Sequence, residues 1–138
     1  MNRRISYRLA LLCGVVLAVA TVCWAKNYHM TSTSIVPAAA GEISVDKEKN
    51  GNVQLHVEVE HLAKPGKLTP PANTYVVWLQ QEGSQPQKLG QLKVGADLKG
   101  ELKATTPLNN FKVFITAETD SQTTIPSDQV VLRATVQQ

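Results

Sequence analysis

Along most of the chain after residue 40, apolar and polar residues alternate, which is the pattern of strands that bury one face and expose the other. Ile43 and Val45 begin one such row, and the apolar positions of residues 53–59 continue it after the pair Asn50-Gly51. Both residues of an Asn-Gly pair accept positive φ angles, so the pair favours a tight turn. The pattern therefore predicts a β-hairpin with one buried face.

Residues 74–81 have a different pattern, because bulky apolar and aromatic residues run from Tyr75 to Leu79 without a polar break. A strand that is apolar on both faces has to be covered on both faces. We therefore expect this stretch to be the central strand of a two-layer sheet structure. Trp78 is expected to lie in the core, since a buried tryptophan removes a large apolar area from water.

Shorter alternating rows follow at residues 89–94, 98–105, 111–117 and 130–136. Leu89 is out of phase with Leu92, so Gly90 is a natural position for a β-bulge. About seven strands at intervals of roughly ten residues are typical of an antiparallel immunoglobulin-like β-sandwich, which is the fold we predict. The predicted core consists of Tyr75, Val77, Trp78, Leu79, Phe111, Val113, Ile115 and Leu132.

The first 25 residues have the pattern of a secretory signal peptide. Three arginines lie among the first eight residues, residues 9–25 are almost wholly apolar, and Ala25 fits the position before cleavage. We predict an N-terminal apolar helix over this segment. An uncleaved signal anchor is the alternative, although about seventeen apolar residues are short for a span. A lipoprotein with Cys23 at its mature N-terminus ranks below both, because Val22 is a poor residue before a lipidated cysteine.

Both main readings of this segment export the rest of the chain, since the arginines favour the cytoplasmic side. We predict a linker at residues 26–40, rich in Thr, Ser, Ala and Pro, and one β-sandwich domain at residues 41–138. The protein is expected to be periplasmic or otherwise extracytoplasmic. Membrane contact is expected only through residues 9–25, if they stay uncleaved.

Charge and cysteine content change once the leader is set apart. Without Arg3, Arg4 and Arg8, the 14 lysines and arginines of the chain fall to 11 and equal the 11 acidic residues. A neutral domain has no overall electrostatic attraction for nucleic acid, so we expect no nucleic-acid partner. Cys13 and Cys23 both lie in the leader, which excludes disulfides and thiolate metal sites from residues 26–138.

Few residues suggest chemistry. His56, Glu58 and Glu60 alternate along one predicted strand and therefore share a face, where an imidazole and two carboxylates can bind a divalent cation. We interpret them as a solvated strand face and predict no metal or cofactor. Thr116 and Glu118 share the face opposite the inward row, and we interpret them as a surface pair.

No pattern predicts an enzyme. No serine stands in a Gly-x-Ser-x-Gly context, and the glycines are scattered as turn residues instead of forming a phosphate-binding loop. The leader holds both cysteines, so the exported part offers no thiol nucleophile.

Several motifs follow one another in the second half of the chain. They are the strand Tyr75-Val76-Val77-Trp78-Leu79, the turn Leu89-Gly90, the strand end Thr116-Ala117-Glu118, and Pro126 in the loop before the last strand. This series, over residues 74–136, resembles the extracytoplasmic C-terminal domain of anti-sigma-K factor-like proteins. The resemblance implies a β-sandwich outside the cytoplasmic membrane, without catalytic residues, that serves as a sensory or interaction module.

The chain departs from that family at its sigma-binding part. Family members carry a cytoplasmic helical domain that holds the sigma factor, whereas only residues 1–8 precede the apolar segment here. Sigma-factor binding is therefore not carried over.

We expect a non-enzymatic exported interaction or sensory domain that contacts another envelope protein. The expected contact surface is a sheet edge or the loops at residues 64–73 and 120–128, since loops on a rigid scaffold commonly carry recognition. The alternative is a periplasmic small-ligand or glycan-binding module, in which Trp78 would be an exposed platform for sugars.

Overall fold

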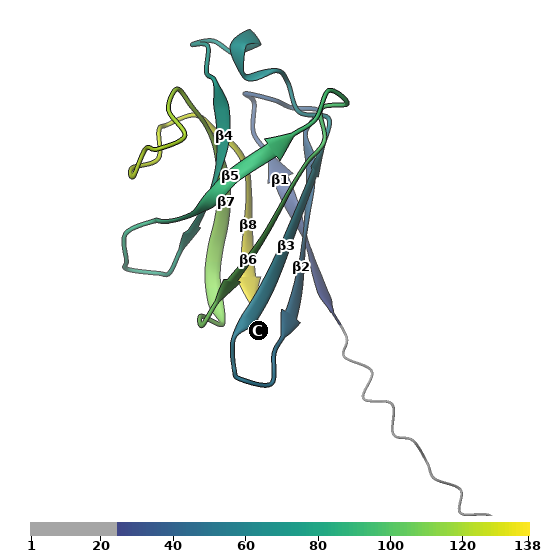
Figure 1. Ribbon diagram of the computed structural model, residues 1–138, viewed down its shortest axis with the longest axis vertical. Coiled ribbons are helices and arrows are strands. Elements are labelled where there is room, and N and C mark those ends of the chain that lie inside the picture. Colours follow the sequence, from purple (N-terminus) through teal and green to yellow (C-terminus); the bar gives the residue numbers. More distant parts are fainter. Residues whose placement is uncertain (1–24) are drawn as a thin grey trace, which may run out of the picture.

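The computed structural model describes residues 25–138, and this part of the chain is all-β (Figure 1). The predicted signal peptide lies, except for Ala25, outside the described residues. Within the described part, no helix has the length and apolarity needed to cross a membrane. Over residues 25–138 a single short 3-10 helix, η1 (Pro65–Lys67), accompanies the strands. The strands are β1 (Lys26–Ser32), β2 (Ala40–Lys47), β3 (Val53–Glu60), β4 (Thr74–Gln80), β5 (Gln87–Val94), β6 (Gly100–Thr106), β7 (Asn110–Glu118) and β8 (Val130–Gln137).

The strands form a closed antiparallel barrel in the order β1-β2-β3-β6-β5-β4-β7-β8, with β8 paired to β1. The predicted immunoglobulin-like sandwich is therefore wrong, although its all-β, antiparallel character is what the structure has. An open sandwich leaves the edges of two separate sheets unpaired, whereas closure of the sheet removes them.

Closure depends on β1 and β5, which change neighbours along their length. β1 pairs with β2 over residues 26–30 and then with β8 at Thr31 and Ser32. β5 pairs with β4 over most of its length and with β6 only at Lys93 and Val94. In Figure 1, β5 crosses the front of the barrel at a steep angle to the other strands. Two short seams therefore close the barrel: β1 with β8 at Thr31 and Ser32, and β5 with β6 at Lys93 and Val94.

Strand β1 lies in the segment that the sequence predicts as a linker, residues 26–40. Side chains at its start bind the end of β8: Lys26 Nζ donates to the carbonyl oxygen of Gln137 at 3.0 Å, and the Tyr28 hydroxyl donates to the same oxygen. Beyond the strand, Thr33 N–H donates to the carbonyl oxygen of Val131 at 3.0 Å. These bonds connect the start of the described chain to its end.

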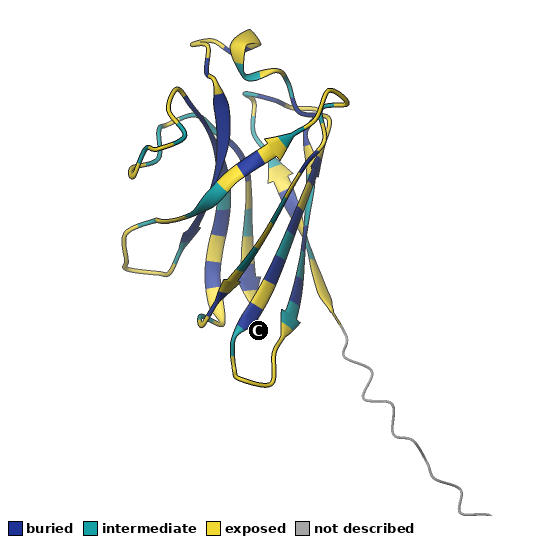
Figure 2. Cartoon of the chain, viewed as in Figure 1, coloured by how far each residue is buried: buried dark blue, intermediate teal, exposed yellow. Residues whose placement is uncertain are grey.

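Apolar side chains from all parts of the sheet fill the barrel interior. Figure 2 shows the resulting alternation of buried and exposed residues along β3, and the almost uniformly buried β4. The eight residues predicted as core are all buried, each with at most 3% of its surface exposed. The predicted hairpin is confirmed, with Gly51 at φ 87° in the turn between β2 and β3.

The predicted bulge is also confirmed. Val77 pairs with Gly90 and Trp78 with Lys88, so Leu89 is an extra residue in the β4–β5 ladder. Because a bulge bends and twists a strand, it helps β5 to turn from β4 toward β6.

Strand β4 is covered on both faces, as its sequence predicts, but by different structures. Tyr75, Val77 and Leu79 belong to the interior, while Val76 and Trp78 are fully buried on the outer face. Hydrogen bonds place the β7–β8 loop, residues 119–129, beside this outer face: Ser127 N–H and hydroxyl both bond to β7. The Lys88 ammonium of β5 also donates to the carbonyl oxygen of Ser121 in this loop. The covering layer is thus a loop, not a second sheet.

Candidate functional site

A buried polar chain begins at Trp78. Its indole Nε1 donates to Thr116 Oγ1 at 2.8 Å, and the Thr116 hydroxyl donates to Glu118 Oε1 at 2.6 Å. The same carboxylate oxygen accepts the Ser127 N–H at 2.7 Å. We call Trp78, Thr116, Glu118 and Ser127 the Trp78 network.

The interpretation of Thr116 and Glu118 as a surface pair is wrong. Thr116 is fully buried and Glu118 is only 6% exposed, because the β7–β8 loop lies over them. Each polar group of the network has a hydrogen-bond partner, as buried polar groups need. The Trp78 network therefore fixes the loop to the barrel, and its indole is not an exposed platform for a sugar.

A second group of polar residues lies on the outer face of β3 and β6. His56 Nε2 is 3.1 Å from Glu101 Oε2 and 3.4 Å from Glu58 Oε1. One ligand atom from each residue can be chosen so that all three lie within 4.8 Å of one another. We call these residues the His56 cluster. The sequence places His56 and Glu58 together, but the third candidate, Glu60, takes no part, and its Oε1 instead lies 3.6 Å from Lys99 Nζ.

Strand register explains why Glu101, and not Glu60, belongs to the His56 cluster. Glu101 of β6 stands directly opposite Glu58 of β3, and Glu42 of β2 stands opposite Glu58 on the other side. Three carboxylates thus occupy neighbouring positions in one row across the sheet. Like charges that lie directly opposite each other are destabilising. The pairing of β3 with β6 joins residues far apart in the sequence, and no local pattern reveals it.

A third feature is a groove of about 630 Å³ on the outer wall formed by β4, β7, β8 and β1. Its polar and charged lining comes from Gln80, Lys112, Arg133 and Thr135, with His29 at the β1 side, and Phe114 contributes an aromatic ring. Register places Phe114 beside Arg133, and Arg133 beside Thr31. We call this feature the basic groove.

The basic groove carries two positive charges without counter-ions. Within residues 25–138, neither Lys112 nor Arg133 forms a salt bridge, and no acidic residue lines the groove. His29, which also lines the groove, does have a carboxylate nearby: its Nδ1 lies 4.0 Å from Glu42 Oε2 of β2. The groove therefore presents a local positive potential beside the ring of Phe114, which suits an acidic ligand.

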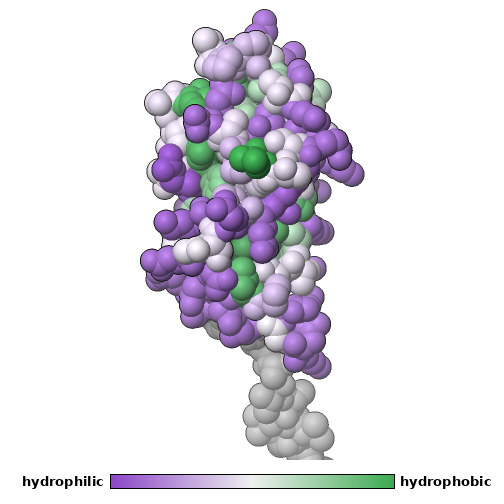
Figure 3. Space-filling view, turned by 90° about the vertical axis from the view of Figure 1, so that its left-hand side faces the viewer, coloured by the Kyte–Doolittle hydropathy of each residue, from purple (hydrophilic) through white to green (hydrophobic). Residues whose placement is uncertain are grey.

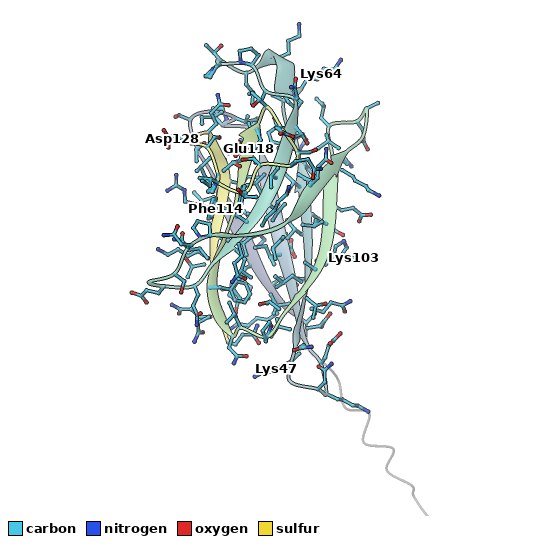
Figure 4. The ribbon with its side chains drawn as sticks, turned by 60° about the vertical axis from the view of Figure 1, so that its left-hand side comes forward. Lys47, Lys64, Lys103, Phe114, Glu118 and Asp128 are labelled. Atoms are coloured by element: carbon cyan, nitrogen blue, oxygen red, sulfur yellow. The ribbon has the colours of Figure 1, made fainter. Side chains whose placement is uncertain are left out.

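The basic groove and the His56 cluster face different directions. Figure 4 shows Phe114 and Glu118 on the side that carries the β7–β8 loop, and Lys103, the register neighbour of His56, on the other side. Figure 3, which views the loop side, shows small apolar areas separated by hydrophilic residues. No sequence pattern predicts the groove, because its residues come from four strands, including one in the predicted linker.

Burial also affects one titratable group, the Tyr75 hydroxyl of β4. The Tyr75 hydroxyl donates to the carbonyl oxygen of Ala63 at 2.6 Å, and desolvation by burial raises the pKa of Tyr75 to about 12. The neutral Tyr75 hydroxyl therefore has a structural role, because it holds the segment that connects β3 to β4.

Comparison with known proteins does not assign the chain to a family. No protein-family model matches the chain, and no curated protein matches it. The resemblance of residues 74–136 to anti-sigma-K factor-like proteins stays a prediction.

Proposed function

We propose that this protein is a non-enzymatic interaction domain of the extracytoplasmic space, and that the basic groove binds an acidic segment of another envelope protein. The observation that carries the proposal is the pair of uncompensated charges, Lys112 and Arg133, beside the half-buried ring of Phe114. The signal-peptide pattern of residues 1–25 supports export.

Charge complementarity selects the class of partner. Complementary charges steer encounter and fix register between partners, while a matching apolar contact supplies burial. The groove offers both features, because cationic side chains line it and Phe114 lies within it. An acidic segment with an apolar or aromatic residue would satisfy this surface.

A neighbouring apolar residue favours a protein over a small molecule. Ile125, in the β7–β8 loop, is 76% exposed, and the loop leads directly to Val130 in the groove lining. Single exposed apolar residues are common, but one in the loop that runs into a groove strand can extend the contact surface. A protein partner can cover both the groove and the loop, whereas a small ligand fills only the groove.

In-cell photo-crosslinking tests the proposal. A photoreactive residue placed at Thr135, in the groove, is expected to give a discrete protein adduct in the native host. The same residue at Lys103, on the other side of the barrel, is the matched control and is expected to give none. Arg133→Glu and Lys112→Glu should each lower the adduct yield by about tenfold, since each reverses a charge at the contact. Equal adducts at both positions, or yields that charge reversal leaves unchanged, would contradict the proposal.

A periplasmic module for small acidic ligands or glycans is the second candidate function. The groove volume of about 630 Å³ favours it, because ligand pockets of about 300–1,000 Å³ are usual. Titration with a uronic-acid oligosaccharide, followed by NMR, discriminates the two functions. Saturable shifts at Phe114 and Arg133 without any protein adduct would favour the ligand module, and Ile125→Ser would then leave the affinity unchanged.

A further inference from the structure

The His56 cluster leads to a separate inference, which does not rest on the proposed function. We propose that His56, Glu58 and Glu101 form a binding site for a divalent transition-metal ion of the Zn²⁺ type. The observation is the close approach of one imidazole nitrogen to two carboxylates on adjacent strands.

Distances between the ligand atoms fit a tetrahedral ion. With bonds of about 2.0–2.1 Å to nitrogen and oxygen, neighbouring ligands of a tetrahedral Zn²⁺ lie about 3.3 Å apart. His56 Nε2 lies 3.1 Å from Glu101 Oε2 and 3.4 Å from Glu58 Oε1. Both nitrogen-to-oxygen distances are therefore close to the ligand separation that a tetrahedral Zn²⁺ requires.

Backbone register holds the ligands in this arrangement. His56 and Glu58 are two positions apart on β3 and share a face, while Glu101 on β6 stands opposite Glu58. β3 buries its other face in the barrel core, and β6 packs its half-buried Leu102 against that core, so the backbone positions of the three ligands are fixed. The side chain of His56 is 29% exposed, whereas those of Glu58 and Glu101 are 63% and 68% exposed. Solvent can therefore supply a fourth ligand.

Local charge also favours a cation. Glu42, Glu58 and Glu101 form one row of carboxylates across three strands. Lys93 and Lys103 flank the cluster in register, yet in residues 25–138 neither forms a salt bridge with it. A bound divalent ion would relieve the repulsion within the row. The nitrogen ligand selects Zn²⁺ or a similar ion over Mg²⁺ and Ca²⁺, which prefer oxygen ligands alone.

Metal titration of the untagged protein, as its host cells process it, tests the inference. Calorimetry with ZnCl₂ is expected to show saturable binding of roughly one equivalent, and zinc should raise the unfolding temperature because it binds the folded state. MgCl₂ at the same concentration should do neither. His56→Gln and Glu101→Gln should each weaken zinc binding by about tenfold or more, since even outer-shell changes at metal sites cost that much.

Two matched variants serve as controls. Glu60→Gln and His61→Gln change the same residue types close by, outside the cluster, and should bind zinc as the wild type does. If several ions bind, NMR of the imidazole rings resolves the sites: zinc should shift the His56 ring at lower concentration than those of His29 and His61. Binding that His56→Gln leaves unchanged, the absence of saturation, or equal binding of Mg²⁺ would overturn the proposal.

Discussion

Trp78 shows how one residue connects the barrel wall to the loop that covers it. Its ring is fully buried on the outer face of β4, and its Nε1 donates to Thr116 Oγ1. Thr116 in turn donates to Glu118, which accepts a backbone N–H from the loop. The indole therefore contributes both burial and one end of a satisfied polar chain.

Removal of the indole should destabilise the fold strongly. Trp78→Ala is expected to lower the free energy of unfolding by about 3–5 kcal/mol, because it leaves a cavity beneath the loop. Trp78→Phe keeps most of the apolar volume and should cost about 1–2 kcal/mol, since it deletes one hydrogen bond. Urea unfolding monitored by circular dichroism measures both. An unfolding midpoint that Trp78→Ala leaves unchanged would show that the loop does not bury this residue.

The raised pKa of Tyr75 predicts that the folded protein loses stability at alkaline pH. In the unfolded chain, its hydroxyl ionises near pH 10, whereas burial raises the pKa of Tyr75 in the folded chain to about 12. Between these values the unfolded state holds fewer protons, so the free energy of unfolding falls as pH rises. The contribution is fully present below about pH 10, and about 2–3 kcal/mol should be lost by about pH 12.

Urea unfolding of the wild type and of Tyr75→Phe, from about pH 9 to about pH 12, isolates this effect. Tyr75→Phe removes only this hydroxyl and leaves every other side chain in place, so the difference between the two curves belongs to Tyr75. A difference that does not change with pH would refute the predicted linkage.

At the level of elements, closure of the barrel depends on two short seams, β1–β8 and β5–β6. β5 reaches β6 only at Lys93 and Val94, opposite Glu101 and Gly100. The backbones come close there: a Cβ on Gly100 would lie 2.9 Å from Leu92 Cγ and 3.1 Å from the Lys93 carbonyl oxygen. Only glycine fits this approach without movement of β5.

Gly100→Ala should therefore open this seam. We expect the free energy of unfolding to fall by about 1–3 kcal/mol, the usual cost of overpacking. Gly66→Ala is the matched control, because a Cβ there meets nothing within 4 Å, and its effect should be close to zero. Thermal unfolding of both variants measures the difference. Equal melting temperatures for the two variants would contradict the tight contact between β5 and β6.

Strands were easier to predict than their arrangement. Alternation along residues 53–59 and the apolar run at residues 75–79 depend only on which face is buried, and they predict β3 and β4 directly. The same alternation serves a sandwich and a barrel equally. The two folds differ in the pairing of Thr31 with Arg133 and of Lys93 with Glu101, which join distant segments.

The candidate sites, too, can be predicted only where their residues lie on one strand. His56 and Glu58 lie on one strand, so their shared face could be predicted, but Glu101 joins them only through the pairing of β3 with β6. Burial of Glu118 depends on a loop that folds back over its own strand. The basic groove needs β1, which lies in a segment whose Thr, Ser, Ala and Pro content favours a linker, and whose burial is limited mainly to Met30.

For the whole molecule, closure and the proposed contact surface depend on the same strand. β1 pairs with β2 and β8 and contributes His29 and Thr31 to the basic groove. If residues 26–32 were a linker, the barrel would be open between β2 and β8 and the groove would lack one wall. Both closure and the groove therefore require that residues 26–32 form a strand.

NMR of the protein in solution shows whether residues 26–32 form this strand. The structure predicts a cross-strand Hα–Hα contact or its amide equivalent between Thr31 and Arg133, which are register partners. It also predicts slow hydrogen exchange of the Thr33 amide, which donates to Val131. Random-coil shifts and rapid exchange over residues 26–33 would contradict the closed barrel, and with it the groove on which the proposed function depends.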